Sequence, residues 1–467
     1  MDKPVIKDLR GIVGKQHVQS APEEVALYSY DATPFAPRAR PDAVVFPGSA
    51  EEVASVVQLA NRARFPVIPR GAGSGLTGGA RPIQGGVVIS TQRLNRIVKI
   101  DSDNLQVVVQ PGVVTEDLQD AVEAVGLFYP PDPQSKEFCT IGGNLAENAG
   151  GPRAMKYGVT RNYVLALQVV LPTGTLVRLG ARTVKSVVGY DLLSLLVGSE
   201  GTLGIITEAT LRLLPDPGAR GTLLAVFDDM RVAAAAVAAT FKAGVMPSAI
   251  EFMDRASIRC VEEYEPAGLP TDAAAVLVVE VDGGSAEVER LTGKVKSVME
   301  ASGARQIRTS ANAEEAEALW KSRRAVGPAL ARIAPIKVNE DIVVPLSRLP
   351  EAVSGVHELA RKHGVECACF GHAGDGNIHV NLLVDTGDPD AVRRSDQAVD
   401  SIFELVIKLE GSITGEHGVG TTKQHFIGME LKPEVIDTMI RVKQALDPQG
   451  ILNPGKIFPW NPGSNKS

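Results

Sequence analysis

The chain contains few cysteines, and this scarcity limits its redox chemistry. The 467 residues include four, at Cys139, Cys260, Cys367 and Cys369. Their spacing matches none of the usual four-cysteine patterns that ligate iron–sulfur clusters, so we expect no such cluster in this chain. Cys367 and Cys369 share one face of a predicted strand, and we interpret them as small core residues rather than a redox pair. So few cysteines suit a reducing cytoplasm.

The chain also lacks an excess of basic residues and a long hydrophobic run. Lys and Arg number 48 against 55 Asp and Glu, which gives a formal net charge of −7. No positive field is therefore available for nucleic acid or an anionic membrane. No run approaches the roughly 18 apolar residues of a membrane-spanning helix. The first residues, MDKPVIKDLRGIVG, do not read as a signal peptide. We expect a cytoplasmic protein that reaches a membrane, if at all, through a partner.

The length of the chain and its composition, with 44% hydrophobic and 22% charged residues, fit a globular protein of two or three domains. The first half predicts two α+β lobes. In one, a strand at 42–47 precedes a helix that opens with a capping box of Ser49 and Glu52, and a strand at 66–69 follows. The other has a strand at 105–110, a helix over 115–125 and two strands around the turn at 172–174.

The pattern changes after Pro215-Asp216-Pro217. Strands are predicted at 221–227 and 274–281, and helices at 229–243 and 285–302. This order indicates an antiparallel sheet with helices on one face. The last hundred residues contain two histidine-bearing loops and a helix near 388–409.

The first half of the chain contains three glycine-rich loops. Residues 73–78, GSGLTG, match the dinucleotide-binding pattern G-x-G-x-x-G, but a β-run rather than a helix follows, which disfavours a Rossmann site. The backbone N–H groups between Gly71 and Gly79 are still suited to a pyrophosphate. Similar loops at 130–151 and 198–207 would let the backbone approach a large planar ligand. The alternative is three independent tight turns.

Two short loops concentrate the reactive side chains. Residues 370–381 read FGHAGDGNIHVN and residues 411–420 read GSITGEHGVG. A hairpin turning at Gly374-Asp375-Gly376 would bring His372 and His379 together. Glu416 could add an oxygen ligand, which gives the two-histidine, one-carboxylate pattern of a catalytic divalent-metal site, with zinc as the expected ion and His417 available as a base. The alternative is that these histidines are ordinary hydrogen-bonded loop residues.

Six segments in this order resemble one family. They are PRGAGSGLTGGA, CTIGGNLAENAGG, GSEGTLGIITEATLRLLP, FGHAGDGNIHVN, GEHGVG and ILNPGKIF. The chain is similar over roughly residues 36–458 to the FAD-dependent D-2-hydroxyacid dehydrogenases, which include D-lactate dehydrogenase, D-2-hydroxyglutarate dehydrogenase and the catalytic subunit of glycolate oxidase.

The resemblance implies an α+β fold: a two-lobed, vanillyl-alcohol-oxidase-type FAD-binding domain, a ferredoxin-like antiparallel-sheet substrate domain and a helical C-terminal segment. The implied limits are a helical extension at 1–35, the FAD-binding domain at 36–216 with lobes of about 36–100 and 101–216, and a substrate domain at 217–458. The last of these carries the metal site and a segment that returns to the flavin, and a tail follows at 459–467.

The resemblance also implies the FAD-binding residues. The glycine loop would hold the pyrophosphate, the other loops would line adenosine and flavin, and Asn453 would lie near the isoalloxazine. The implied residues are Pro69, Arg70, Gly71, Ala72, Gly73, Ser74, Gly75, Leu76, Thr77, Gly78, Pro131, Asp132, Thr140, Gly142, Gly143, Asn144, Asn148, Gly150, Gly151, Tyr157, Gly158, Glu200, Gly201, Gly204, Ile206 and Asn453. The loop has no His or Cys at the position that covalent members use, so we expect noncovalent FAD.

In the same family, His372, His379 and Glu416 correspond to metal ligands and His417 to the catalytic base. Asn381 corresponds to a substrate contact. The segment ALWKSRRAVG matches the family's Leu-Trp-x-x-Arg element, so Arg323, rather than its neighbour Arg324, would bind the substrate carboxylate with Lys337 nearby. Gly327 stands where the hydroxyglutarate-specific enzymes carry a Thr, which disfavours that substrate.

The predicted activity is oxidation of a D-2-hydroxy acid, such as D-lactate or a glycolate-like acid, with hydride transfer to FAD. D-2-hydroxyglutarate is an alternative substrate. The electrons would leave to an electron-transfer flavoprotein, an iron–sulfur subunit, a quinone or oxygen, and a homodimer is compatible with the resemblance. Alternatives from other classes are a metal-dependent hydrolase, which would be colourless, and a noncatalytic flavin-binding subunit.

Overall fold

The structure is a computed structural model that describes residues 1–33, 39–334, 336–385 and 387–459. The chain forms two compact units. The first unit comprises residues 1–150, 159–216 and 416–467, and the second comprises 151–158 and 217–415. The predicted domain start at residue 36 and the tail residues 460–467 lie outside the described residues.

The first unit contains a small sheet with the strand order β1-β2-β4-β3. Its strands are β1 (Val18–Gln19), β2 (Ala43–Val45), β4 (Val87–Ser90) and β3 (Val67–Arg70). Strands β2 and β3 both run parallel to β4, as a β-α-β unit requires. The connecting helix α3 (Ala50–Ala63) begins where the sequence predicts it. Ser49 Oγ accepts a bond from Glu52 N at 3.2 Å, which confirms Ser49 as the N-cap of the predicted capping box. The Glu52 carboxylate accepts from Gly48 N at 2.7 Å rather than from Ser49 N, so the second bond of the box goes to the residue before the cap.

The core of this part lies between the sheet and two helices. Helix α3 buries Val53, Val56 and Val57, and α1 (Lys3–Val13) adds Leu9. Leu452, which follows α16 in the sequence, packs into the same core, and an isolated bridge pairs it with Val67 of β3. The segment around Leu452 is thereby fixed next to β3, where the glycine loop begins.

A second sheet in this unit has the order β5-β6-β10-β8-β9 and is antiparallel throughout. Its strands are β5 (Ile97–Asp101), β6 (Gln106–Val109), β10 (Ile205–Arg212), β8 (Val164–Val170) and β9 (Leu176–Gly180). The predicted turn between β8 and β9 is confirmed, with Gly174 at φ +80°. The predicted helix is α4 (Thr115–Glu123).

The remaining elements of the first unit are short apart from one helix. They are α2 (Pro22–Ala26), β7 (Leu127–Phe128), α5 (Ile141–Glu147), α7 (Leu192–Leu196), β11 (Leu214–Pro215), α15 (Ile427–Glu430) and α16 (Pro433–Leu446). Strands β7 and β11 pair with each other.

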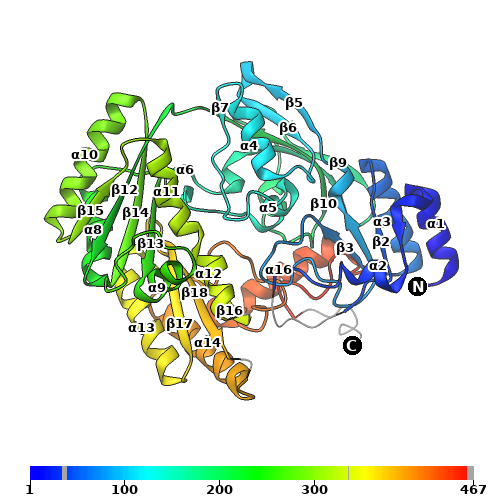
Figure 1. Cartoon of the computed structure of the whole chain (residues 1–467). Helices are drawn as coiled ribbons and strands as arrows, with labels where there is room; N and C mark the ends of the chain where they lie inside the picture. Colours follow the sequence, from blue (N-terminus) through cyan, green and yellow to red (C-terminus); the bar gives the residue numbers. More distant parts are fainter. Residues whose placement is uncertain (34–38, 335, 386, 460–467) are drawn as a thin grey trace. The chain divides into compact units, whose positions relative to one another are not determined.

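The second unit is built on one antiparallel sheet with the order β15-β12-β14-β13-β17-β18-β16 (Figure 1). Its strands are β15 (Gln306–Thr309), β12 (Ala219–Phe227), β14 (Ala275–Gly283), β13 (Ala249–Asp254), β17 (Glu366–His372), β18 (Asn377–Val384) and β16 (Ile336–Val343). The predicted hairpin is therefore confirmed as β17–β18, and β13 and β16 flank it.

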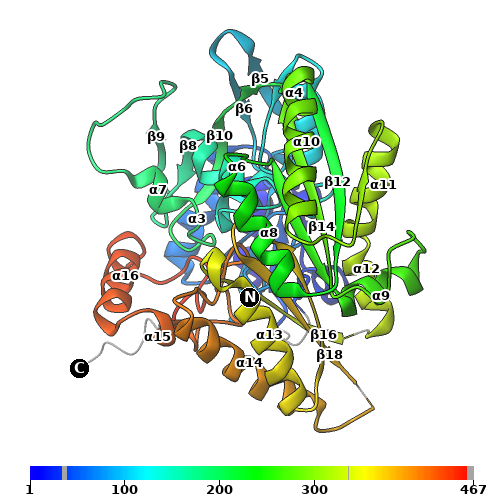
Figure 2. The same cartoon turned by 90° about the vertical axis from the view of Figure 1, so that its left-hand side faces the viewer.

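Helices cover both faces of this sheet. One layer faces the viewer in Figure 2 and comprises α10 (Ser285–Ala301), α8 (Met230–Lys242), α13 (Leu349–Lys362) and α14 (Ala391–Lys408). The other face packs with α9 (Arg255–Tyr264), α11 (Ala313–Arg324) and α12 (Val326–Ile333). The expectation of helices on one face was wrong. Strand β14 reads AVLVVEV, and such a continuous apolar run belongs to a strand that is buried on both sides.

A short helix, α6 (Ala154–Tyr157), completes the second unit. Across all described residues, no helix is both long and apolar enough to cross a membrane.

Candidate functional site

The hairpin β17–β18 brings the two predicted histidine ligands together. His372 ends β17 and His379 lies in β18; both are buried, and their ring centroids are 5.1 Å apart at nearly perpendicular planes. The turn between them depends on Gly376, whose φ is +82° and where a Cβ would overlap the Val344 carbonyl. The local sequence thus predicts both the turn and the pairing of the imidazoles.

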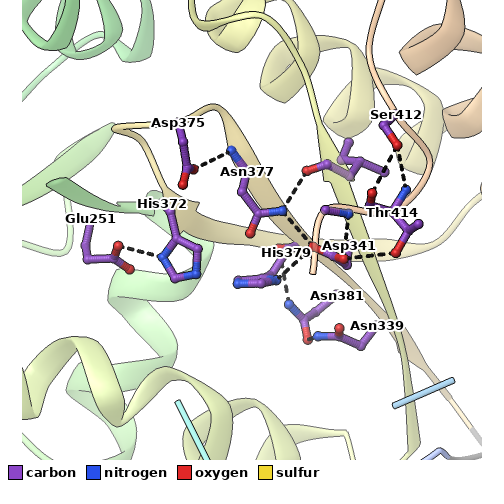
Figure 3. A network of polar contacts seen from close by, with 12 residues as sticks. Glu251, Asn339, Asp341, His372, Asp375, Asn377, His379, Asn381, Ser412 and Thr414 are labelled. Carbon is purple, nitrogen blue, oxygen red and sulfur yellow. Dashed lines mark hydrogen bonds and ion pairs between the residues drawn. The ribbon is translucent and has the colours of Figure 1, made fainter. Parts of the chain in front are cut away.

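A buried carboxylate orients His372. Glu251, on the neighbouring strand β13, accepts a hydrogen bond from His372 Nδ1 at 2.6 Å (Figure 3). Its other oxygen lies 2.7 Å from the guanidinium of Arg323. Burial would raise the pKa of Glu251, but the positive groups of His372 and Arg323 outweigh it, and the pKa lies below its usual value. A histidine whose Nδ1 donates to a carboxylate is oriented as in carboxylate–histidine–metal arrangements.

The same network separates the two candidate arginines. The Arg323 guanidinium is buried and lies 4.6 Å from the centroid of the Phe370 ring, and its Nε is buried without an acceptor among the described residues. Arg324 is exposed and pairs with Glu317 on its own helix. Arg323 is therefore the buried one of the two arginines, and its role in binding the substrate carboxylate stays a prediction.

A second buried carboxylate, Asp341, anchors the glycine loop that follows α14. It accepts bonds from Asn377 Nδ2 at 2.6 Å, Thr414 Oγ1 at 3.3 Å and Gly415 N at 2.8 Å (Figure 3). Its Oδ1 is 3.9 Å from His379 Nδ1. Gly415 is therefore fixed beside the hairpin, and it is the last residue of the second unit before Glu416.

Two further predicted residues lie on neighbouring strands of the same sheet. Asn381 is buried, accepts from Asn339 Nδ2 at 2.8 Å and donates to the His379 carbonyl at 3.3 Å. Lys337 on β16 donates to the Gly327 carbonyl at 3.3 Å, and burial lowers its pKa. No carboxylate is paired with Lys337 within the described part of the chain, so its charge is uncompensated.

In the first unit, the glycine loop after β3 offers backbone donors. The described residues provide no acceptor for the N–H groups of residues 72–76. Gly73 and Gly78 have φ of +74° and +82°, and a Cβ at Gly78 would overlap Thr421 Oγ1. Beside Gly75 there is open space. A run of free N–H groups next to open space fits an anionic group such as a pyrophosphate.

Other segments of this unit converge on that loop. Thr77 Oγ1 donates to the His417 carbonyl at 3.1 Å, so the predicted base lies beside the loop. Asn453 Nδ2 donates to the carbonyls of Gly79 and Glu200 at 3.0 and 2.8 Å. The Glu200 carboxylate accepts from the N–H groups of the next loop, at Val419 and Gly420.

These loops surround buried charge. Burial raises the pKa of Glu200 and of its neighbour Glu147, and burial lowers the pKa of Lys456 to about 8.

The remaining predicted FAD-binding residues divide between the units. Thr140 caps α5 by accepting from Gly143 N, and a Cβ at Gly71 would overlap the Thr140 hydroxyl, so the loop and the helix are in close contact. Asn144 donates to Thr115 Oγ1 at 2.7 Å inside the core, and Asn148 ends α5 and accepts from Arg161 N.

The other residues of the predicted FAD-binding set also divide between the two units. The first unit also holds Pro69, Arg70, Ala72, Ser74, Leu76, Pro131, Asp132, Gly142, Gly150, Gly201, Gly204 and Ile206. The second unit holds Gly151, Tyr157 and Gly158, and the Tyr157 hydroxyl donates to Asp282 Oδ2 at 2.7 Å.

Sequence reasoning missed Glu251 and Asp341. Each is a carboxylate inside a short apolar strand, in AIEFMD and IKVNEDIV, and neither belongs to a recognisable motif. A charged residue within a buried strand is itself a signal, because such a group is retained only when it is paired.

Comparison with known sequences gives two family matches. Residues 41–180 match the family described as "FAD binding domain", and residues 216–457 match "FAD linked oxidases, C-terminal domain". The chain is 44% identical over 456 residues to the glycolate oxidase subunit GlcD of Bacillus subtilis, which covers 98% of this chain and 97% of that protein. It is 38% identical over 443 residues to a D-lactate dehydrogenase of Anaerostipes hadrus, covering 93% and 91%.

A solved structure of p-cresol methylhydroxylase has the same fold. Its TM-score is 0.82 at 19% identity, covering 97% of this chain and 96% of that one. The predicted fold class is therefore confirmed: an α+β, vanillyl-alcohol-oxidase-type FAD-binding domain followed by an antiparallel-sheet domain.

Proposed function

This chain belongs to the FAD-linked oxidases and is an oxidoreductase acting on 2-hydroxy acids, and from that premise we propose that it oxidises a small D-2-hydroxy acid of the glycolate or D-lactate type to the 2-keto acid. The observation that carries the proposal is the buried array of Arg323, Glu251 and His372 beside His379. It combines a group that recognises carboxylates with oriented imidazoles.

FAD fits the first unit. The unpaired N–H groups of residues 72–76 provide donors for a pyrophosphate, and the open space beside Gly75 leaves room for it. No His or Cys stands in the loop from Gly71 to Gly79, which supports noncovalent binding. When bound, FAD supplies a hydride acceptor for the C2 hydrogen of the substrate.

We assign His372, His379 and Glu416 to a divalent metal, with zinc as the expected ion. The donor chemistry supports it, because Glu251 orients His372 through Nδ1 and because two imidazoles with one carboxylate suit a catalytic ion. When bound, the ion would supply Lewis acidity to the substrate hydroxyl. Asp341 and Asn377 would position the chain around this set through their bonds to each other and to Gly415.

Arg323 and Lys337 would hold the substrate carboxylate. Their situations differ, since the charge of Arg323 is balanced by Glu251 whereas that of Lys337 has no carboxylate partner among the described residues. Lys337 would therefore supply the net attraction, and Arg323 would supply direction through its remaining N–H donors. Asn381 would contact the substrate from β18.

His417 would act as the general base by taking the C2 hydroxyl proton on a ring nitrogen. The Thr77 bond to the His417 carbonyl fixes its backbone beside the glycine loop, which supports a role next to the flavin. General-base catalysis of this type contributes about 10² to 10⁴ in rate.

The electrons would then leave to another protein or to a quinone. The described cysteines are too few and too scattered for an iron–sulfur cluster. Several relatives are named as subunits of glycolate oxidase, which supports a multi-subunit assembly in which an iron–sulfur or electron-transfer subunit takes the electrons.

Two alternatives can be tested at the same time. The Gly327 carbonyl accepts a hydrogen bond from Lys337, so residue 327 lies beside a proposed substrate-binding group. The hydroxyglutarate-specific enzymes that this chain resembles carry a Thr at this position. Its absence here argues for a small substrate over D-2-hydroxyglutarate. A metal-dependent hydrolase built on the same histidines would not need FAD, so the matches to FAD-linked oxidase families disfavour it.

The test is the visible spectrum of the purified protein under anaerobic conditions, before and after addition of glycolate, D-lactate, D-2-hydroxyglutarate and the L-isomers. We expect a flavin band that bleaches with glycolate or with one D-acid. Bleaching by D-2-hydroxyglutarate alone would overturn the substrate assignment. A colourless protein that takes up no FAD would overturn the function and favour the hydrolase.

A further inference from the structure

A second cluster of metal-binding side chains lies on the other face of β17. Strand residues alternate in direction, so Cys367 and Cys369 point away from the face that carries Phe370 and His372. His357, on the covering helix α13, places Nδ1 3.1 Å from Cys367 Sγ. One ligand atom from each of these three residues lies within 4.8 Å of the others. Nothing in the proposed oxidation of hydroxy acids uses this cluster.

Asp254 orients the imidazole of this cluster. Its Oδ2 lies 2.7 Å from His357 Nε2 and accepts a bond from Cys369 N at 2.6 Å. Its Oδ1 accepts from Ser257 N at 2.7 Å and caps α9. The carboxylate is thus held from three directions, and it fixes His357 with Nδ1 directed at the thiols.

We propose that His357 Nδ1, Cys367 Sγ and Cys369 Sγ form a binding site for a single thiophilic metal ion of the Zn²⁺ class, with Asp254 as the positioning residue. Thiolate and imidazole ligands, with a carboxylate on the second ring nitrogen, are the donor set that such ions select. The site is separate from the His372 and His379 pair, which offers no sulfur.

The three ligand atoms would have to move little to bind an ion. With metal–sulfur bonds of about 2.3 Å, two thiolates on a tetrahedral ion lie about 3.8 Å apart. Ligand atoms that already lie within 4.8 Å of one another would need to close by about 1 Å or less. His357 and Cys367 are partly exposed, whereas Cys369 is buried, so the proposed ion would enter from the solvent side and keep a water as its fourth ligand.

A disulfide explains the pair less well. Both cysteines lie in the regular ladder with β18, where Cys367 pairs with Leu382 and Cys369 with Val380. Residues two apart on a strand are separated by about 6.6 Å between Cα atoms, at the long end of the disulfide range. A metal ion spans this separation without disturbing the ladder.

The electrostatics favour the ligand form of the outer cysteine. The hydrogen bond from Cys369 and the neighbouring His357 lower the pKa of the Cys367 thiol. The hydrogen bond to Cys367 and burial raise the pKa of Cys369, and a coordinated ion would overcome this by binding the deprotonated thiol.

The test uses Co²⁺ as the probe, added to metal-free, FAD-loaded protein under reducing conditions. Thiolate ligands produce an intense sulfur-to-cobalt charge-transfer absorption, which a site of histidines and a carboxylate lacks. The signal therefore distinguishes this cluster from His372, His379 and Glu416. The difference spectrum is recorded against protein without cobalt, which removes the flavin bands.

We expect the charge-transfer band in the wild type and its loss in Cys367→Ser, Cys369→Ala and His357→Gln. Cys260→Ser is the matched control, because Cys260 is a buried free cysteine on α9 outside the cluster, and it should keep the band. Each cluster variant should bind one cobalt equivalent fewer than the wild type by elemental analysis, with an unchanged circular-dichroism spectrum.

The absence of a charge-transfer band in correctly folded wild type would overturn the proposal, as would a band that persists in a Cys367→Ser/Cys369→Ala double variant. Alkylation of Cys367 at the same rate with and without cobalt would also count against it, because a coordinated thiolate is shielded from alkylation.

Discussion

The two units present their polar groups in different ways. In the first unit the glycine loop offers backbone N–H groups, and the features that matter are space and backbone conformation: an open position at Gly75, a positive φ at Gly78. In the second unit the groups are side chains on adjacent strands, where Glu251, Arg323 and His372 hold one another. A backbone site is damaged by adding atoms, and a side-chain site is damaged by removing them.

The largest expected effect is removal of a charge from the side-chain network. Glu251→Gln should lower the free energy of unfolding of the second unit by about 3–5 kcal/mol, because it leaves buried Arg323 without its carboxylate. Urea unfolding followed by Trp320 fluorescence in a Trp460→Phe background reports on this unit. Glu317→Gln, at the exposed partner of Arg324, is the control and should change little. Equal effects of the two variants would contradict the network.

A loss of rate without a loss of stability is expected at His417. His417→Gln should slow anaerobic flavin reduction by about 10²- to 10⁴-fold, or about 3–5 kcal/mol, while FAD remains bound. Stopped-flow absorbance measures the step directly. His425→Gln, an exposed histidine eight residues away, serves as the control. Flavin reduction at the normal rate in His417→Gln would exclude its role as the base.

Lys337 should give a smaller, pH-dependent effect on substrate binding. Lys337→Met should raise KM by the equivalent of about 1.5–3 kcal/mol, the contribution of one charged hydrogen bond. Burial lowers the pKa of Lys337, so in the wild type KM should rise as pH increases through that lowered pKa, because the cation is lost. Lys337→Arg should remove this rise, since arginine stays protonated. A KM profile that is the same in wild type and Lys337→Arg would disprove the assignment.

The smallest expected effect is at the glycine loop of the first unit, where backbone N–H groups form the proposed site. Gly78→Ala should cost about 1–3 kcal/mol of stability through its positive φ, in addition to overlap with Thr421, and should reduce the FAD content. Gly75→Ala should fold like the wild type, because nothing lies within 4 Å of the added Cβ, so any weakening of FAD binding would report the ligand rather than the fold. Calorimetry and the flavin-to-protein absorbance ratio measure the two quantities. A Gly78→Ala variant as stable as Gly75→Ala would show that the loop tolerates added atoms.

The same contrast explains what could be predicted from the sequence. The hairpin at His372, the helix cap at Ser49 and the glycine loop depend on residues close together in the chain, so they could be predicted from the local sequence. Glu251 lies 121 residues from its partner His372, and no short motif links them. The placement of helices on both faces of the sheet could likewise not be predicted, because a strand that is buried on both sides shows no alternation of apolar and polar residues.

The alternation along β17 also has an evolutionary consequence. Thiols leave the strand on one side and His372 on the other, and a shift of one residue in its pairing would exchange the two sides. An insertion or deletion of a single residue within this strand would then disrupt both proposed sets of metal ligands in one event, whereas substitutions of its apolar residues would spare them. Among homologues, the length of this segment should therefore vary less than its composition.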